Sequence, residues 1–192
     1  MIAKSLDVVV LLKLFLLRDR KPLAPCSGIS ASLSSPRLQN SVGYARLSKE
    51  LGISASEIHA SVRRGIAAGL IAAESKLPMR KPLQEFLLYG VRYAFPAKEG
   101  SLARGMPTAH AAPPLAEHIT SDELPPVWPD PKGTVKGHAV EPLHPSVPFA
   151  ARLDPGLYEC LALIDALRIG HAREQKLAED ELKLRLNHAY EC

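Results

Sequence analysis

Cysteine is scarce in this sequence, with three residues at positions 26, 160 and 192. They lie far apart and match neither the spacing of a zinc site nor a disulfide framework. The pattern therefore predicts no metal site and is typical of a reducing cytoplasm. Aromatic residues make up only 5% of the chain, so we expect a core built mainly from leucine, isoleucine, valine and alanine.

The sequence also lacks a long, uninterrupted hydrophobic run. Asp7 and Lys13 interrupt the apolar stretch near the N-terminus, and the basic residues Arg18, Arg20 and Lys21 follow it. A signal peptide would have to stay apolar at these positions, and the stretch is too short to span a bilayer. We therefore expect a cytoplasmic protein that does not contact the membrane.

Signatures of catalysis are absent as well. The chain contains no glycine-rich phosphate loop, no nucleophile elbow and no HExxH or paired-cysteine motif. Its histidines between residues 96 and 150 are irregularly spaced, which is typical of solvated loop residues rather than metal ligands. The sequence thus predicts a protein that is not an enzyme and that carries no cofactor or metal.

Charge is distributed unevenly along the chain, although the net charge is only +4. Residues 1–100 hold 15 Lys and Arg against 7 Asp and Glu, whereas residues 101–192 hold 9 against 13. This asymmetry indicates that a polyanionic partner would bind the first half of the chain.

Residues 5–17 are predicted to form a helix that is apolar on almost every side. Such a helix is buried on several sides. A small domain has too little surface to cover it alone, and we therefore expect a partner subunit to cover part of it in a homodimer. Residues 19–40 are predicted to form a loop, and residues 83–95 a further helix.

Proline is concentrated in one segment, because 11 of the 17 prolines fall within residues 96–150. This segment also carries bulky apolar residues, including Trp128, and ordering it requires substantial burial. We expect an ordered, extended arm, with a few short strands, that wraps the winged domain or the partner subunit and ties the C-terminal helices to the DNA-binding part. Residues 154–188 are predicted to be helical, with Asp154 as the N-cap, Pro155 at the first helical position and a break at Gly170.

The most informative stretch is residues 41–71. Tyr44, Leu47 and Leu51 form the inner face of a short helix, and Gly52 follows it, where a left-handed residue ends a helix. Ser54 begins the next helix in a capping box with Glu57. In that helix Ile58, Val62 and Ile66 form a buried stripe, and Gly69 ends it before a short strand. The pattern predicts a helix-turn-helix followed by a small β-hairpin, or wing, at residues 72–82.

The second helix (54–69) would enter the major groove of DNA, since most of its outward residues are polar or basic, and the wing (72–82) would contact the backbone or the minor groove. Arginine side chains suit phosphates, while hydroxyls and His59 can reach base edges. The candidate DNA-binding residues are Ser54, Ser56, His59, Ser61, Arg63 and Arg64 on the helix, and Lys76, Arg80 and Lys81 on the hairpin.

These residues resemble the winged helix-turn-helix transcription regulators, broadly the MarR-like group, over residues 5–82. The shared positions are Leu47, Glu50 to Ser54, Ile58, Val62 to Arg64 and Ala68 to Ile71. The sequence departs from the pattern at Ala60, where such proteins often have a base-reading polar residue. It also departs at Gly65, where they have an apolar one, which implies a loosened helix or a close approach of the backbone.

The sequence therefore predicts a mainly α fold in three parts: a winged helix-turn-helix domain (1–95) with a small β-wing, a proline-rich extended arm (96–150) and a C-terminal helical region for dimerisation or partner binding (151–192). The resemblance implies a transcription regulator that binds double-stranded DNA as a homodimer. An alternative is a non-enzymatic adaptor or antitoxin-like protein. It would bind a protein partner through the winged helix and residues 96–192.

Overall fold

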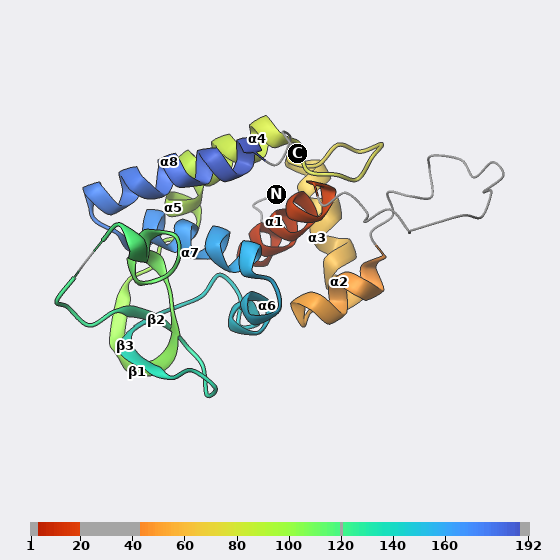
Figure 1. Cartoon of the computed structure of the whole chain (residues 1–192). Helices are drawn as coiled ribbons and strands as arrows, with labels where there is room; N and C mark the ends of the chain where they lie inside the picture. Colours follow the sequence, from red (N-terminus) through yellow and green to blue (C-terminus); the bar gives the residue numbers. More distant parts are fainter. Residues whose placement is uncertain (1–3, 20–42, 120, 189–192) are drawn as a thin grey trace, which may run out of the picture.

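The computed structural model describes residues 4–19, 43–119 and 121–188, so most of the loop predicted at 19–40 lies outside the described residues. The protein is mixed α/β, largely helical, with one small three-stranded sheet (Figure 1). Its α-helices are α1 (Ser5–Asp19), α2 (Tyr44–Leu51), α3 (Ala55–Ala67), α4 (Arg80–Glu85), α5 (Val91–Ala94), α6 (Val147–Leu153), α7 (Pro155–Ile169) and α8 (Ala172–His188). A π-helical turn, η2 (Phe86–Gly90), joins α4 to α5, so the helix predicted at 83–95 forms but begins earlier, at Arg80.

Helix α1 lies at the centre of the molecule. Its apolar residues from Leu6 to Phe15 are at most 5% exposed in the single chain, because α3 packs on one side and α7 on another. The reason for expecting a partner subunit over this helix is therefore wrong, because α3 and α7 of the same chain cover it. The dimer itself stays a prediction.

A buried ion-pair network holds α1 against its neighbours. The Lys13 ammonium is 3% exposed and lies 2.8 Å from Asp154 Oδ2 and 2.7 Å from Glu50 Oε2. Glu50 belongs to α2 and Asp154 is the N-cap of α7, whose other oxygen accepts the Leu157 N–H. One cation thus ties together three helices that are far apart in the sequence.

The sheet forms within the segment that was predicted to be an extended arm. Strand β1 (Glu99–Pro107) pairs antiparallel with β2 (Pro126–Pro129) and with β3 (Val135–Val140), and β2 and β3 pair in parallel, which closes the sheet on itself. The closure is tight: a Cβ on Gly105 would lie 2.0 Å from the Trp128 carbonyl oxygen, and one on Gly137 would lie 1.9 Å from that of Pro125. Glycine is required where backbones approach this closely.

This segment is ordered and packs within its own chain, mainly against α7 and, through α6, against α2 of the predicted winged domain. Trp128 is 1% exposed, and its indole N–H donates to Asp165 of α7 over 2.5 Å. Thr108 Oγ1 donates to the same carboxylate oxygen over 2.9 Å, and the Tyr158 hydroxyl donates to the Pro107 carbonyl. The 3₁₀ turns η3 (Ala109–Ala111) and η4 (Leu115–Glu117) connect β1 to β2.

The C-terminal helices form as predicted, with Asp154 capping α7, Pro155 at its first position and Gly170 between α7 and α8. Helix α8 packs along α7 and reaches α4. One continuous hydrophobic cluster contains residues from all three predicted parts of the chain. Among the residues that the structure describes, no helix is long and apolar enough to cross a membrane.

Candidate nucleic-acid interface

The turn between α2 and α3 follows the local signals in the sequence. Gly52 takes the left-handed conformation (φ 66°), and its N–H donates to the Ser48 carbonyl, which ends α2. Ile53 is 6% exposed and fills the space between the two helices. Ser54 is the N-cap of α3, and its hydroxyl accepts the Glu57 N–H over 3.2 Å. The two helices therefore meet at a tight, capped corner, called here the α2–α3 corner (residues 44–67).

Helix α3 lies close to the rest of the molecule along its buried stripe. Ile58 and Val62 are 0% and 3% exposed. A Cβ on Gly65 would lie 2.8 Å from the Ile71 side chain, so this glycine serves a close approach rather than a loosened helix. Gly69 has φ 71° and follows the helix, as predicted.

Part of the predicted DNA-binding set lies on one exposed face. Ser54, Ser56, His59 and Arg63 are all exposed. The His59 ring packs edge-on against Tyr44 of α2, with ring centroids 5.9 Å apart. Within the described part of the chain no hydrogen bond or ion pair engages the Arg63 guanidinium. This face combines hydroxyls, an imidazole and one available cation, which are groups that can contact phosphates and base edges.

Two other predicted residues do not face outward. Ser61 is 1% exposed, and its hydroxyl has no hydrogen-bond partner among the described residues. Arg64 is held by the buried Asp7 of α1, at 2.7 and 2.9 Å, and by Glu57 at 3.2 Å. Hydrogen bonding to Asp7 raises the pKa of Arg64 although burial opposes it. The outward orientation expected for both residues is therefore wrong, and Arg64 is a structural residue that joins α3 to α1.

The predicted hairpin is shorter than expected. Residues 70–79 fold back with a single bridge between Ile71 and Pro78, and the Met79 N–H donates to the Leu70 carbonyl over 2.8 Å. Lys76, at the turn, is exposed with φ 56°. Arg80 and Lys81 belong instead to the first turn of α4, and Arg80 hydrogen-bonds to Asn187 of α8. Their assignment to a wing is wrong, because the helix begins at the residue after Met79.

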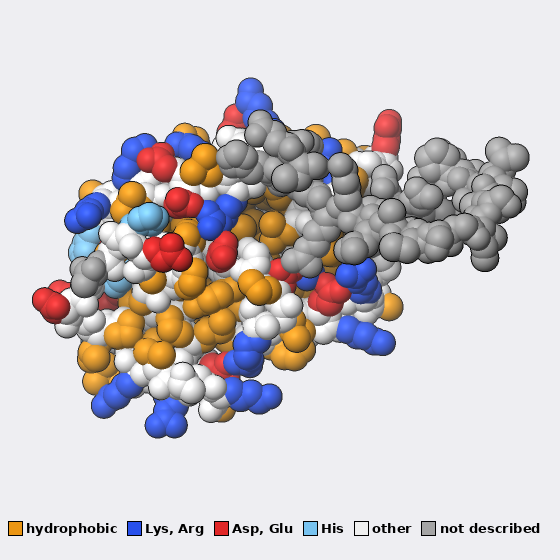
Figure 2. Space-filling model, in the orientation of Figure 1, with side chains coloured by type: hydrophobic (Ala, Val, Ile, Leu, Met, Phe, Trp, Pro, Cys, Tyr) orange, Lys and Arg blue, Asp and Glu red, His pale blue; other side chains and the backbone are white. Residues whose placement is uncertain are grey.

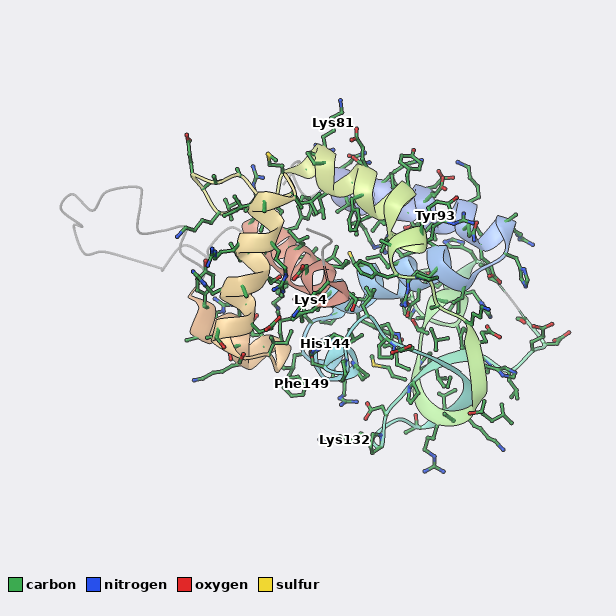
Figure 3. All side chains as sticks on the ribbon, turned by 180° about the vertical axis from the view of Figure 1, so that it is seen from behind. Lys4, Lys81, Tyr93, Lys132, His144 and Phe149 are labelled. Carbon is green, nitrogen blue, oxygen red and sulfur yellow. The ribbon has the colours of Figure 1, made fainter. Side chains whose placement is uncertain are left out.

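Sequence reasoning missed the segment that supports the α2–α3 corner. A Cβ on Gly52 would lie 3.1 Å from the Phe149 ring and 3.7 Å from Ser146. Phe149 belongs to α6 and lies beside α2, and His144 lies on the loop before α6 (Figure 3). Burial lowers the pKa of His144, while the charge of Glu57 acts in the opposite direction. No local signal marks these contacts, because they join residues nearly a hundred positions apart.

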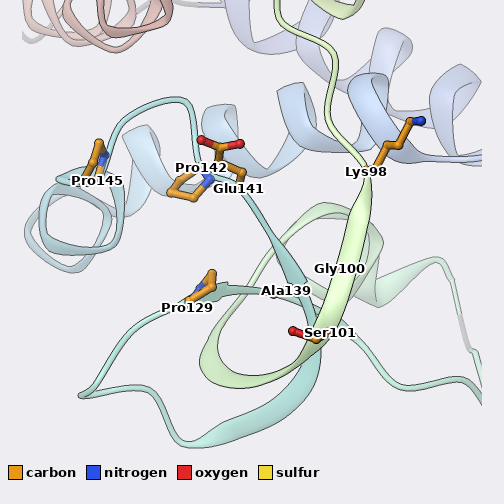
Figure 4. A pocket seen from close by; sticks show the side chains of 8 residues that line it. All are labelled: Lys98, Gly100, Ser101, Pro129, Ala139, Glu141, Pro142 and Pro145. Atoms are coloured by element: carbon orange, nitrogen blue, oxygen red, sulfur yellow. The ribbon is translucent and has the colours of Figure 1, made fainter.

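A pocket of about 510 Å³ lies beside the small sheet (Figure 4). Pro129, Pro142 and Pro145 line it together with Gly100, Ser101 and Ala139, and Lys98 and Glu141 stand at its edge. None of the predicted DNA-binding residues lines this pocket.

Within the described ranges, no group of three His, Cys, Asp or Glu side chains could hold a metal ion. Burial raises the pKa of Cys160 to about 12, so its thiol is not a nucleophile at neutral pH. Comparison with known proteins identifies no matching family model, no similar curated protein and no similar solved structure.

Proposed function

We propose that this chain is a non-catalytic DNA-binding protein that inserts α3 into the major groove, in the manner of a winged helix. The arrangement of α1, α2, α3 and the hairpin at 70–79 supports this proposal. So does the exposure of Ser54 and Ser56, because the N-terminal residues of a recognition helix contact base edges. Lys76 at the hairpin turn can contact the sugar–phosphate backbone beside the groove.

The observation that best supports the proposal is the exposure of Arg63 on α3. Arg64 is neutralised by Asp7, and Arg46 on α2 is paired with Glu50 at 2.6 Å. Arg63 by contrast is exposed, and no described carboxylate pairs with it. An arginine held on a rigid helix without a counterion is well suited to neutralise a phosphate.

Replacement of Arg63 with alanine should weaken binding to a mixed-sequence duplex and flatten the slope of log K against log salt by about one unit. The reason is the loss of one phosphate contact and its released counterion. Fluorescence anisotropy across a salt series measures both quantities. Arg173→Ala removes an equal charge from α8 and should change neither; equal behaviour of the two variants would refute α3 as the binding surface.

Self-association as a homodimer is favoured by two exposed tyrosines. Tyr89 and Tyr93 are 59% and 75% exposed on the helical segment 80–94. Arg92 lies over the Tyr93 ring, 5.0 Å from its centroid. Tyrosine and arginine dominate the binding energy of protein interfaces, so this face is the best-supported location for the second subunit of a homodimer.

If this face forms the dimer, light scattering at micromolar concentration should report about twice the chain mass of 20.8 kDa. The double variant Tyr89→Ser with Tyr93→Ser should report the monomer, because exposed tyrosines contribute to the interface without supporting the core. Leu184→Ser, which removes an exposed apolar residue of α8, serves as the control. A wild-type monomer, or a variant that remains dimeric, would exclude this face.

A further inference from the structure

Four basic side chains surround one end of the closed sheet. Arg104 of β1 lies directly opposite Lys136 of β3 in the antiparallel ladder. Lys132 lies in the turn between β2 and β3, and Arg152 reaches the same turn from α6. All four are exposed. Together Arg104, Lys132, Lys136 and Arg152 are called the basic cluster.

Asp130 is the carboxylate that contacts the basic cluster, and it is already engaged. Asp130 is 7% exposed, forms an ion pair with Arg152 and accepts the Lys132 N–H over 3.0 Å. Burial alone would raise the pKa of Asp130, but these partners lower it, so the group stays ionised. Within the described residues, no hydrogen bond or ion pair engages the side chains of Arg104, Lys132 or Lys136.

The cross-strand pair is unfavourable for the isolated protein. Side chains directly opposite each other in an antiparallel ladder have Cβ atoms about 5 Å apart, and like charges at this separation destabilise the pair. Glu99 belongs to the same ladder but lies opposite Val140, at the other end of β1 from Arg104. Glu117, Asp122 and Glu123 lie in the connection between β1 and β2. In Figure 2 basic side chains project from the lower edge of the molecule, beneath the strands. An external anion would relieve this repulsion.

The basic cluster lies on the same edge of the molecule as the start of α3. Arg152 and Phe149 are both on α6, a helix of seven residues and thus about 10 Å long. Phe149 packs against Gly52, which lies in the turn between α2 and α3. Figure 3 shows Lys132 and Phe149 toward one edge, with Lys81 and Tyr93 toward the opposite edge. The basic cluster is therefore near enough to the α2–α3 corner for one duplex, whose helical repeat is about 34 Å, to reach both.

We propose that the basic cluster is a second phosphate-backbone contact, which binds the same duplex that α3 enters. This inference rests on the proposed function and extends it: α3 supplies groove contacts, and the sheet supplies sequence-independent affinity. The recognised chemistry is the phosphodiester backbone, contacted by two lysines and an arginine that have no other described partner.

The test compares three proteins for binding to a mixed-sequence duplex of about 30 base pairs, nearly three helical turns. The cluster variant carries Arg104→Ala, Lys132→Ala and Lys136→Ala, and retains Arg152 so that Asp130 keeps its partner. Loss of three phosphate contacts should weaken binding at least about tenfold at low salt and flatten the salt slope by about two to three units. The control carries Arg173→Ala, Lys176→Ala and Lys183→Ala on α8, which lowers the net charge equally, and should bind as the wild type does.

Parallel measurement of Arg63→Ala separates the two proposals. Weakening by both the cluster variant and Arg63→Ala supports both proposals. Weakening by the cluster variant alone supports the basic cluster and refutes α3 as the interface. Weakening by Arg63→Ala alone, or a cluster variant no weaker than the α8 control, overturns the basic cluster. If the wild type binds no duplex, both proposals fail.

Discussion

Replacement of Lys13 with methionine is expected to lower the free energy of unfolding by about 3–5 kcal/mol, the usual cost of removing one member of a buried ion pair. Lys13 lies between the carboxylates of Asp154 and Glu50, and all three meet where α1, α2 and α7 converge. Burial alone would raise the pKa of Glu50, but its hydrogen bonds from Arg46 and Lys13 lower it. Without Lys13, two carboxylates would face each other across a largely buried junction. Urea unfolding measures the loss.

A double variant separates the charge effect from a packing effect. Lys13→Met with Asp154→Asn removes both charges, while asparagine can still cap α7. It should recover a large part of the stability lost in Lys13→Met, and the Asp154→Asn single variant completes the double-mutant cycle that gives the coupling energy of the pair. Lys176→Met removes a fully exposed partner of Asp180 and should leave the urea midpoint unchanged. A Lys13→Met protein as stable as the Lys176→Met control would show that the buried network contributes nothing.

Replacement of Asp165 with leucine is expected to cost a similar amount, about 3–5 kcal/mol, because three buried donors lose their acceptor. The carboxylate accepts the Trp128 indole N–H, the Thr108 hydroxyl and, at 2.6 Å, the Arg168 guanidinium. These bonds attach the sheet to α7. The loss should therefore appear both in the urea midpoint and as a red shift of Trp128 fluorescence under native conditions. Thr134→Val, a substitution at an exposed position between β2 and β3, should change neither the urea midpoint nor the fluorescence of Trp128.

The pH dependence provides an independent check on Asp165. Burial raises the pKa of this carboxyl, although Arg168 and the hydrogen bonds oppose the shift. A raised pKa in the folded state means that folding favours the protonated form, so the contribution is fully present below the unfolded-state pKa, near 3.9, and falls as pH rises through the folded value. The stability advantage of the wild type over Asp165→Asn should thus shrink as pH rises. An advantage that grows would contradict the direction of the shift.

The α2–α3 corner could be predicted because its determinants are local. Gly52, Ser54 and Gly69 act on backbone groups within four residues of themselves, and sequence spacing is enough to recognise them. The same local reasoning treated Arg63 and Arg64 alike. Asp7, 57 residues earlier in the chain, binds one of them and not the other, and helical periodicity contains no information about that partner.

The sheet could not be predicted in the same way. Its prolines argue against regular structure. Its ladder pairs residues that are distant in the sequence, such as Leu102 and His138, which are 36 positions apart, and no local pattern links such partners. The need for glycine at three positions could not be predicted, because a backbone segment from elsewhere in the fold passes close to each of them: Gly105, Gly133 and Gly137. Only the burial of Trp128 followed from composition, because so many bulky apolar residues require a packed environment.

The central position of α1 determines the order in which the protein can acquire its structure. This helix leaves the ribosome well before α7, yet α7 covers part of its apolar surface, and its Lys13 pairs with Asp154, which lies 141 residues later. Contacts of such long range are entropically costly to form and slow to assemble. During synthesis, part of the apolar surface of α1 remains exposed until α7 has emerged, and until then it is a target for chaperones and for aggregation. The tertiary core is therefore completed by the last third of the chain, whatever local structure α2 and α3 form earlier.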